Sequence, residues 1–351
     1  MKANPRVLVI RGGAIGDFVL TLPVLRLLRD MIPGVHIEVM GYLSIATLAQ
    51  TAGLADSVRS LEHRTFAPFF AKNAPLDEAL AASSYDAAVI CTPAHLHLPM
   101  AKRLLGHGLH VFIEKPLAID ETLVPEVRAA IAAANRFVAV AYVYHLMPWI
   151  QQARAFLQTG QIGRVLQATS VSGQHFPTFR PAYREIYYTR RETGGGVIQD
   201  ALTHLANAVE WLLGPCTRVY CDAAHQALEG VTIEDTVNVT ARHGAVMVSY
   251  AMTQFQAPNE NTLHIHGEHG SVKIEGHLQR WGVLKHGEKD WTWHVTPPLE
   301  RDDLFIAQAN AFLDGMKGLP NPLCTFEEAV QTLRFNLAAL RSSDTGTAID
   351  L

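Results

Sequence analysis

The chain has 351 residues, of which 48% are hydrophobic and 18% are charged, and its formal net charge is −4. This length favours about two domains, and the composition is typical of a globular protein rather than a disordered one. The weak negative charge predicts neither a nucleic-acid surface nor attraction to an anionic membrane. We therefore expect a small-molecule partner.

The first apolar run, residues 7–10, ends at Arg11 and is too short for a signal peptide or a membrane span. The four cysteines stand singly, without a CxxC pair: Cys91, Cys216, Cys221 and Cys324. Their spacing matches neither a disulfide framework nor a zinc site. These features predict a cytoplasmic protein with reduced thiols and no bound metal.

The first eighty residues predict a βα arrangement. A β-branched run at residues 6–10 precedes a glycine turn, a helical pattern at residues 18–31 and a second strand at 36–40. Further short helices are expected over residues 45–52 and 76–82.

The alternation of strands and helices continues to about residue 144. Continuous apolar strands are expected at residues 87–91 and 110–113, with a helix over 98–105 between them. Strands buried on both faces predict a parallel, doubly wound sheet, whose ligands bind beyond the carboxyl ends of the strands. Thr92-Pro93 and Glu114-Lys115 fall at such ends.

After Pro148 the pattern changes to a helix over residues 150–158 and then several short strands. These strands are expected at residues 218–223, 236–241, 246–253, 262–266 and 271–275, followed by helices around 304–316 and 326–341. The predicted fold is α/β: a Rossmann-like domain over residues 1–147, then an α+β domain over 148–351 with an open, mainly antiparallel sheet.

Lys115 is the first candidate for chemistry, because Glu114-Lys115-Pro116 directly follows an apolar strand. An ammonium group at the mouth of a parallel sheet can polarise a reacting hydroxyl. A surface ion pair at a strand end is an ordinary alternative, so this tripeptide alone is weak evidence.

Asp200 and His204 are the second candidates. The glycines at 194–196 open a helix that runs to Gly214, and residues four apart share one helical face. A carboxylate beside an imidazole suits a general base. A hydrogen bond on a helix face without any catalytic part is equally compatible with this spacing, and more common.

Four motifs occur in one order: TPAHLH (92–97), HVFIEKPLA (110–118), QTGQIGRV (158–165) and GGGVIQDALTHLANAVEWLLG (194–214). From about residue 85 onward, the chain therefore resembles the glucose-fructose oxidoreductase, inositol dehydrogenase and MocA (Gfo/Idh/MocA) family. The resemblance implies a NAD or NADP cofactor and hydride transfer between nicotinamide and a secondary alcohol of a sugar, sugar derivative or cyclitol. It also implies a homo-oligomer, a dimer or tetramer, built on the open sheet.

The resemblance assigns roles to residues that match its motifs. Lys115 would be the active-site lysine, His204 the proton acceptor, and Asp200 its neighbour and a substrate ligand. Thr92, Pro93, His97, Glu114 and Lys115 itself would line the cofactor. Asn207 stands where an aspartate is frequent in the family, at a position we interpret as structural.

Polar residues before the glycine triplet are further candidates for contact with substrate hydroxyls, above all Arg180 and Tyr183, with Arg184, Tyr187 and Tyr188 beside them. Arginine and tyrosine are also ordinary surface and interface residues, so both interpretations stay open.

The front segment departs from the usual dinucleotide fingerprint. Gly12, Gly13 and Gly16 are expected to bind the cofactor pyrophosphate, but Arg11 stands where GxGxxG has its first glycine. No acidic residue follows the second strand to bind ribose hydroxyls. Residues 7–42 instead resemble the heptosyltransferases that use ADP-heptose, a resemblance that reaches about residue 86 and leaves 87–147 as the dehydrogenase-like part of the domain.

Three functions remain open. The favoured one is a working nicotinamide-dependent dehydrogenase; the second is a catalytically impaired relative that binds a sugar-like ligand or acts as an oligomeric binding protein. A glycosyltransferase is third, because the second nucleotide-binding domain of the heptosyltransferases has no counterpart in this chain.

Overall fold

The computed structural model describes residues 5–11, 21–60, 85–300 and 302–351, and it divides the chain into two units. The first unit contains Met1–Tyr142 and Arg301–Phe326, and the second contains Val143–Glu300 and Glu327–Leu351. Two expected features, the glycine turn with Gly12, Gly13 and Gly16 and the helix over residues 76–82, lie outside the described residues.

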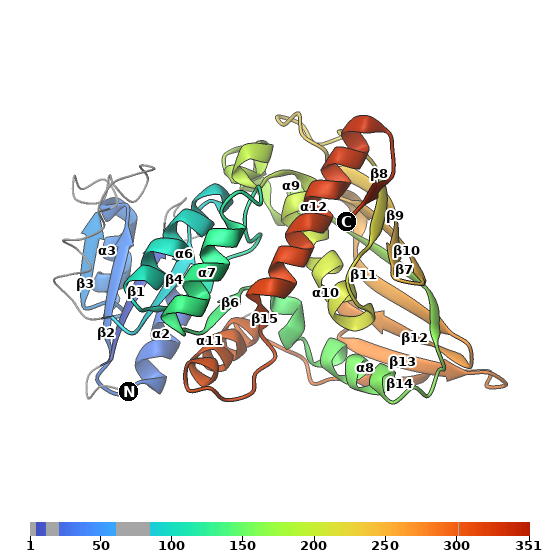
Figure 1. Ribbon diagram of the computed structural model, residues 1–351, viewed down its shortest axis with the longest axis horizontal. Helices are drawn as coiled ribbons and strands as arrows, with labels where there is room; N and C mark the ends of the chain where they lie inside the picture. Colours follow the sequence, from blue (N-terminus) through green and yellow to red (C-terminus); the bar gives the residue numbers. More distant parts are fainter. Residues whose placement is uncertain (1–4, 12–20, 61–84, 301) are drawn as a thin grey trace. The chain divides into compact units, whose positions relative to one another are not determined.

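The first unit is built on a seven-stranded sheet with the order β15-β6-β5-β4-β1-β2-β3 (Figure 1). Its strands are β1 (Arg6–Arg11), β2 (His36–Gly41), β3 (Ser57–Ser60), β4 (Ala87–Cys91), β5 (His110–Ile113), β6 (Val138–Val140) and β15 (Cys324–Thr325). All neighbouring pairs are parallel except β15 with β6. The order reverses between β1 and β4, which makes this the switch point of a doubly wound sheet.

Five helices of the first unit are described: α2 (Leu22–Met31), α3 (Leu43–Thr51), α6 (His97–Gly106), α7 (Val124–Ala134) and α11 (Asp303–Met316). Helix α2 starts with Pro23 in its first turn, a position where the missing N–H costs nothing. Its buried Leu25 and Leu28 pack with Val7 and Val9 of β1.

Residues 301–326 belong to the first unit, whereas the sequence placed them in the second. The reason is aromatic packing: Phe312 of α11 stacks on Phe112 at 5.1 Å and packs on Phe137 at 5.6 Å. In addition, Cys324 of β15 pairs with Val140 of β6. A single domain boundary drawn along the sequence cannot show that a later segment packs in the first unit.

The second unit is built on a nine-stranded sheet with the order β14-β13-β12-β11-β7-β10-β9-β8-β16. Its strands are β7 (Val165–His175), β8 (Arg218–Ala224), β9 (Thr236–His243), β10 (Val246–Thr253), β11 (Phe255–Gly267), β12 (Gly270–Glu275), β13 (Arg280–Lys285), β14 (Thr292–Val295) and β16 (Ile349–Asp350). The β7–β10 pair is parallel and the other pairs are antiparallel.

One face of this sheet carries the core of the second unit. Along β9, Val237, Val239 and Ala241 are buried while Asn238 and Thr240 are exposed, the alternation of a sheet covered on one side. The helices of this unit are α8 (Pro148–Gln158), the short α9 (Phe176–Phe179), α10 (Thr203–Leu213) and α12 (Phe326–Thr345). The predicted fold class is therefore confirmed, with a parallel Rossmann sheet followed by a mainly antiparallel one.

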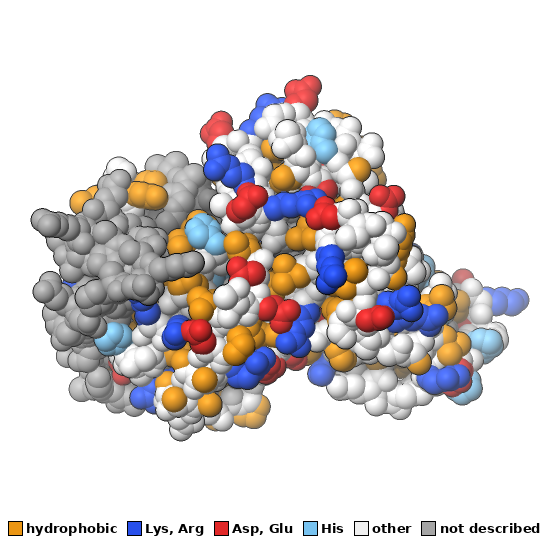
Figure 2. All heavy atoms as spheres, turned by 45° about the horizontal axis from the view of Figure 1, so that its top comes forward, with side chains coloured by type: hydrophobic (Ala, Val, Ile, Leu, Met, Phe, Trp, Pro, Cys, Tyr) orange, Lys and Arg blue, Asp and Glu red, His pale blue; other side chains and the backbone are white. Residues whose placement is uncertain are grey.

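The surface has no region of one charge on the face that Figure 2 shows, where acidic and basic side chains alternate over the described residues. Within the same described part, no helix combines the length and apolar character needed to cross a bilayer.

Candidate functional site

Lys115 lies just beyond the carboxyl end of β5. The Glu114 backbone N–H donates to the Ile90 carbonyl at 2.8 Å, which keeps the chain in register with β4 up to this point. The Glu114 carboxylate then accepts the Lys115 backbone N–H. The Lys115 side chain is half-buried, and so is that of Glu114. The first unit thus holds its candidate lysine at the ligand-binding edge of the sheet.

His97 supports this loop from inside the protein. Its side chain is 1% exposed, and its Nδ1 and Nε2 lie 2.9 Å and 2.7 Å from the carbonyl oxygens of Pro116 and Thr92. Burial lowers the pKa of His97 to about 4, against the two carbonyls, which favour the protonated ring. A neutral ring donates through one nitrogen only, so His97 can satisfy one of these two carbonyls. The ring lies between the end of β4 and the Lys115-Pro116 turn.

Each position of the 194–196 triplet requires glycine for a structural reason of its own. Gly194 and Gly196 have φ of 90° and 88°, a region that favours glycine. A Cβ on Gly195 would lie 2.7 Å from the Arg190 carbonyl oxygen and closer still to the carbonyl of Tyr188. A Cβ on Gly196 would overlap the carboxylate of Glu234.

Glu234 fixes the start of the helix that follows the triplet. Its backbone carbonyl accepts the Val197 N–H at 3.0 Å, and its carboxylate pairs with Arg191 at 3.1 Å. Burial raises the pKa of Glu234, while Arg191 acts in the opposite direction. Arg191 also pairs with Asp344 of α12 at 3.0 Å. The Glu234 backbone therefore contacts the start of the helix, and the ion pairs of Arg191 hold Glu234 in place.

Asp200 lies in a π-helical turn, Ile198–Leu202, at the start of α10. Its side chain is 4% exposed, and Oδ1 accepts the Tyr187 hydroxyl at 2.7 Å. Single π turns within a helix are frequent at functional sites.

His204 lies one turn further along, on α10, and is half-buried. Its ring stacks on Tyr144 with centroids 5.3 Å apart. The Tyr144 hydroxyl accepts the Asn261 amide at 2.9 Å, and burial raises the pKa of Tyr144 to about 12. Tyr144 is therefore a neutral, fixed platform for the imidazole.

The polar segment before the triplet divides into two groups. Tyr183 and Tyr188 are each 1% exposed; the Tyr183 hydroxyl donates to the Glu229 carbonyl at 2.7 Å and the Tyr188 hydroxyl to Gln254. Both rings belong to a small apolar cluster with Phe176. Tyr187 and Arg180 are more accessible.

The sheet of the first unit has the doubly wound strand order of dinucleotide-binding folds. At the switch point, Arg11 pairs with Cys91, so the described end of β1 lies beside the strand that leads into Thr92. Glu38 of β2 cannot serve the ribose, because it is 1% exposed and bound by Tyr85 and Arg59. The sheet fits a nucleotide, while the usual acidic ribose ligand has no counterpart among the described residues at the end of β2.

Two family models match the chain. Residues 42–145 match the model described as the oxidoreductase family with a NAD-binding Rossmann fold, and residues 150–273 match the GFO/IDH/MocA C-terminal domain. The chain belongs to the Gfo/Idh/MocA family. The match begins at residue 42, so the family resemblance extends further toward the N-terminus than the expected start near residue 85.

Curated relatives of this family include 1,5-anhydro-D-fructose reductase of Ensifer adhaerens, 25% identical over 79% of this chain and 83% of its own length. Inositol 2-dehydrogenase of Rhizobium meliloti is 25% identical over 57% of this chain and 60% of its own. Among solved structures, levoglucosan dehydrogenase with NADH and levoglucosan has a TM-score of 0.81 at 18% identity, covering 99% of both chains. The WlbA dehydrogenase from Bordetella pertussis, with NADH and UDP-GlcNAcA, has a TM-score of 0.77 at 22% identity, also covering 99% of both.

Two of the predicted contacts occupy buried positions. Tyr183 lies in the apolar cluster, and its hydroxyl donates to a backbone carbonyl. His97 is buried behind the turn that carries Lys115. Asn207 is 1% exposed and donates to Thr332 at 3.1 Å.

Sequence reasoning missed Tyr144, Asn261 and Glu234, which surround the Asp200–His204 helix in the second unit. These residues come from separate elements and carry no local motif. Lys115 lies in the first unit, and Asp200 and His204 lie in the second.

Proposed function

We propose that the protein is a NAD- or NADP-dependent dehydrogenase acting on a secondary alcohol of a sugar, sugar derivative or cyclitol. The observation that carries this proposal is the placement of Lys115 at the carboxyl end of β5, in the unit that matches the NAD-binding oxidoreductase model. Ligands of open parallel sheets bind at that edge.

The cofactor would be held by the first unit. Thr92, Pro93 and Glu114 follow β4 and β5 and would line it, and Gly12, Gly13 and Gly16 would receive its pyrophosphate through backbone N–H groups. When bound, the nicotinamide supplies the acceptor or donor of the hydride.

The side chains would handle the proton and the developing charge. His204 accepts the hydroxyl proton of the substrate, and its stacking on Tyr144 fixes the plane of the ring. Lys115 stabilises the negative charge that develops on the oxygen. Asp200, held by Tyr187, orients a substrate hydroxyl.

A turnover assay with matched variants tests this proposal. A panel of polyols and sugars with NAD and NADP should give cofactor reduction, and Lys115→Met and His204→Asn should each lower kcat by about 10²-fold or more. NADH affinity should stay near the wild-type value in His204→Asn. Rates unchanged by both substitutions would contradict the assigned roles.

A binding protein without turnover is the second candidate, favoured by Arg11 at the end of β1, where the fingerprint has its first glycine. We propose that residues 7–42, the segment that resembles heptosyltransferases, still offer backbone N–H donors to a phosphate group. Release of ADP from a sugar nucleotide would instead indicate glycosyl transfer.

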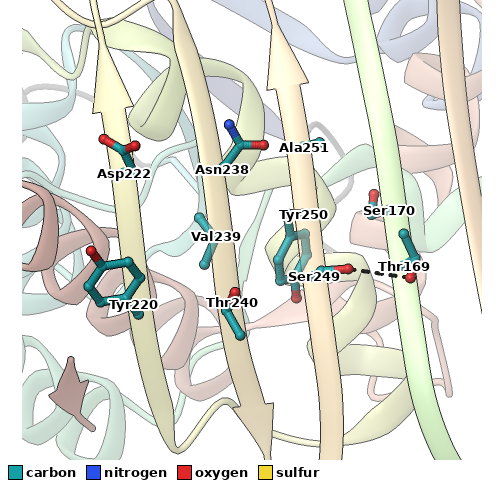
Figure 3. Close-up of a pocket in the computed structure, with 10 residues that line it drawn as sticks. All are labelled: Thr169, Ser170, Tyr220, Asp222, Asn238, Val239, Thr240, Ser249, Tyr250 and Ala251. Atoms are coloured by element: carbon teal, nitrogen blue, oxygen red, sulfur yellow. Dashed lines mark hydrogen bonds between the residues drawn. The ribbon is translucent and has the colours of Figure 1, made fainter.

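We also propose that the open sheet face mediates a homo-oligomer, a dimer or tetramer. Figure 3 shows its hollow, where Tyr220, Thr240, Ser249 and Thr169 form one row across β8, β9, β10 and β7, with a 3.3 Å hydrogen bond between Ser249 and Thr169. Tyr220 is 47% exposed although aromatic. Tyr220→Arg should lower the mass measured by light scattering, and an unchanged mass would exclude this face.

The reduced state of the thiols supports our proposal of a cytoplasmic location. None of the four cysteines, all of which lie in the described part of the chain, forms a disulfide, and burial raises the pKa of Cys216 and of Cys221 to about 12. Reduced thiols suit a reducing compartment.

A further inference from the structure

Asn261 lies on strand β11, on the face of the sheet that carries the core of the second unit. Side chains two residues apart on a strand point to the same face, and Leu263 and Ile265 are buried members of this core. The Asn261 backbone pairs with Ser172 of β7, a strand in the interior of the nine-stranded sheet. The sheet therefore fixes the position of Asn261.

The Asn261 side chain has contacts with two other segments of the second unit. Its Nδ2 donates to the Tyr144 hydroxyl at 2.9 Å. The turn after β12 packs closely on the amide, because a Cβ on Gly276 would lie 3.3 Å from the Asn261 Cγ. In the same turn, the His277 Nδ1 lies 3.2 Å from the backbone nitrogen and from the carbonyl oxygen of Asn261. These contacts restrict the amide to an orientation that reaches Tyr144.

Tyr144 transmits this restraint to His204. The two rings stack with their centroids 5.3 Å apart and their planes inclined by 20°. The hydroxyl is the tyrosine atom furthest from the backbone, so a hydrogen bond there opposes rotation of the ring about χ1. A Tyr144 ring that rotated about χ1 would no longer stack on the imidazole. Asn261, Tyr144 and His204 all belong to the second unit, and two measured contacts connect them.

We infer that Asn261 is a positioning residue: its hydrogen bond to Tyr144 holds the His204 imidazole in the orientation that accepts the substrate proton. A general base must lie within hydrogen-bond reach of the proton it removes, and a small misplacement of a catalytic group lowers the rate. This inference rests on the proposed function, because Asn261 acts through the proposed proton acceptor.

Steady-state kinetics of full-length variants test the inference. Asn261→Leu removes the donor and keeps a side chain of similar shape, whereas Tyr144→Phe removes the acceptor. Each should lower kcat by about 2- to 10-fold, the effect of one neutral hydrogen bond, and leave the KM of the nicotinamide cofactor unchanged. The double variant should lose no more than either single variant, because both substitutions delete the same bond. Asn261→Asp should recover most of the activity, since a carboxylate accepts the proton of the Tyr144 hydroxyl.

The matched control is Thr262→Val, which removes one hydrogen bond from the opposite face of the same strand. Thr262 follows Asn261 on β11, and its hydroxyl donates to Glu260 at 3.0 Å. This variant should lose stability and keep the wild-type kcat. A kcat loss in Asn261→Leu no larger than that in Thr262→Val, or losses that add up in the double variant, would overturn the inference.

Proton–carbon NMR with labelled histidine rings separates the inference from the proposed function, because it needs no turnover. The His204 signal is identified by its absence in His204→Asn, and its chemical shift depends on the stacked Tyr144 ring. Asn261→Leu should move this signal, and Thr262→Val should leave it in place. This result in a protein that oxidises no polyol would contradict only the dehydrogenase function. Turnover with an unmoved His204 signal in Asn261→Leu would contradict only the role of Asn261.

Discussion

The carboxylate of Glu234 occupies the space that a side chain at Gly196 would need, with Cδ 2.7 Å from the position of the missing Cβ. This contact joins the turn before the Asp200–His204 helix to the buried carboxylate that pairs with Arg191. The close approach explains why the third residue of the triplet has no side chain.

Gly196→Ala should therefore destabilise the protein by more than backbone strain alone. Left-handed backbone costs a non-glycine residue about 1–3 kcal/mol, and the overlap with Glu234 adds to it. Gly214→Ala is the control, since Gly214 has φ of 95° and nothing within 4 Å of its missing Cβ. Urea unfolding of both variants measures the difference. Equal losses of unfolding free energy in the two variants would show that the Glu234 side chain moves aside without an energetic cost.

Tyr187→Phe should lower kcat/KM by roughly 10- to 150-fold, because a hydrogen bond to a charged group contributes about 1.5–3 kcal/mol and Asp200 would lose the one from Tyr187. Tyr183→Phe is the matched control, as its hydroxyl donates to a backbone carbonyl in the apolar cluster. It should cost stability and leave kcat/KM unchanged. A kinetic loss in Tyr183→Phe equal to that of Tyr187→Phe would indicate that Tyr183 contacts the substrate, as the sequence predicts.

His97→Leu should lower kcat by at least about 10-fold, because the Thr92 or Pro116 carbonyl that accepts the ring N–H loses its donor, and an unsatisfied buried group costs about 1–3 kcal/mol. His97→Asn can still donate on the Nδ1 side, toward Pro116, and should retain more activity. Equal kcat values in the two variants would show that His97 only fills space behind the turn.

Glu210 predicts a pH-dependent term in stability. Burial raises its pKa to about 7, against hydrogen bonds from Thr332 and the Cys216 backbone. Since the folded state holds this proton more tightly than the unfolded state, the stability from this group is highest below pH 4.5 and falls as the pH rises toward 7. Relative to the wild type, Glu210→Gln should become more stable by about 2–3 kcal/mol when the pH rises from roughly 5 to roughly 7.5, as measured by urea unfolding.

The control for this pH effect is Glu229→Gln, whose carboxylate is 88% exposed. It should track the wild type at both pH values. If Glu210→Gln does so as well, the Glu210 carboxyl titrates normally in the folded protein.

Much of the frame was predictable from the sequence. Continuous apolar runs at 87–91 and 110–113 predict β4 and β5 because such strands are buried on both faces, and the position of Lys115 follows from them. The triplet 194–196 likewise marks the start of the helix with Asp200 and His204.

Other features depend on tertiary contacts. Strand β7 contains Gln167, Thr169, Ser170 and Ser172, so it lacks an apolar alternation, and its partners β10 and β11 define it as a strand. The π turn at Asp200 and the Tyr144 platform also arise from distant segments and give no local signal. Pairings of this kind cannot be inferred from periodicity.

The central claim is that this chain uses a nicotinamide cofactor although Arg11 departs from the usual glycine fingerprint. Fluorescence titration of the purified protein with NADH and with NADPH tests it most directly. The account predicts a saturable change with at least one of them, and the tighter one identifies the cofactor. No change with either dinucleotide would contradict the account.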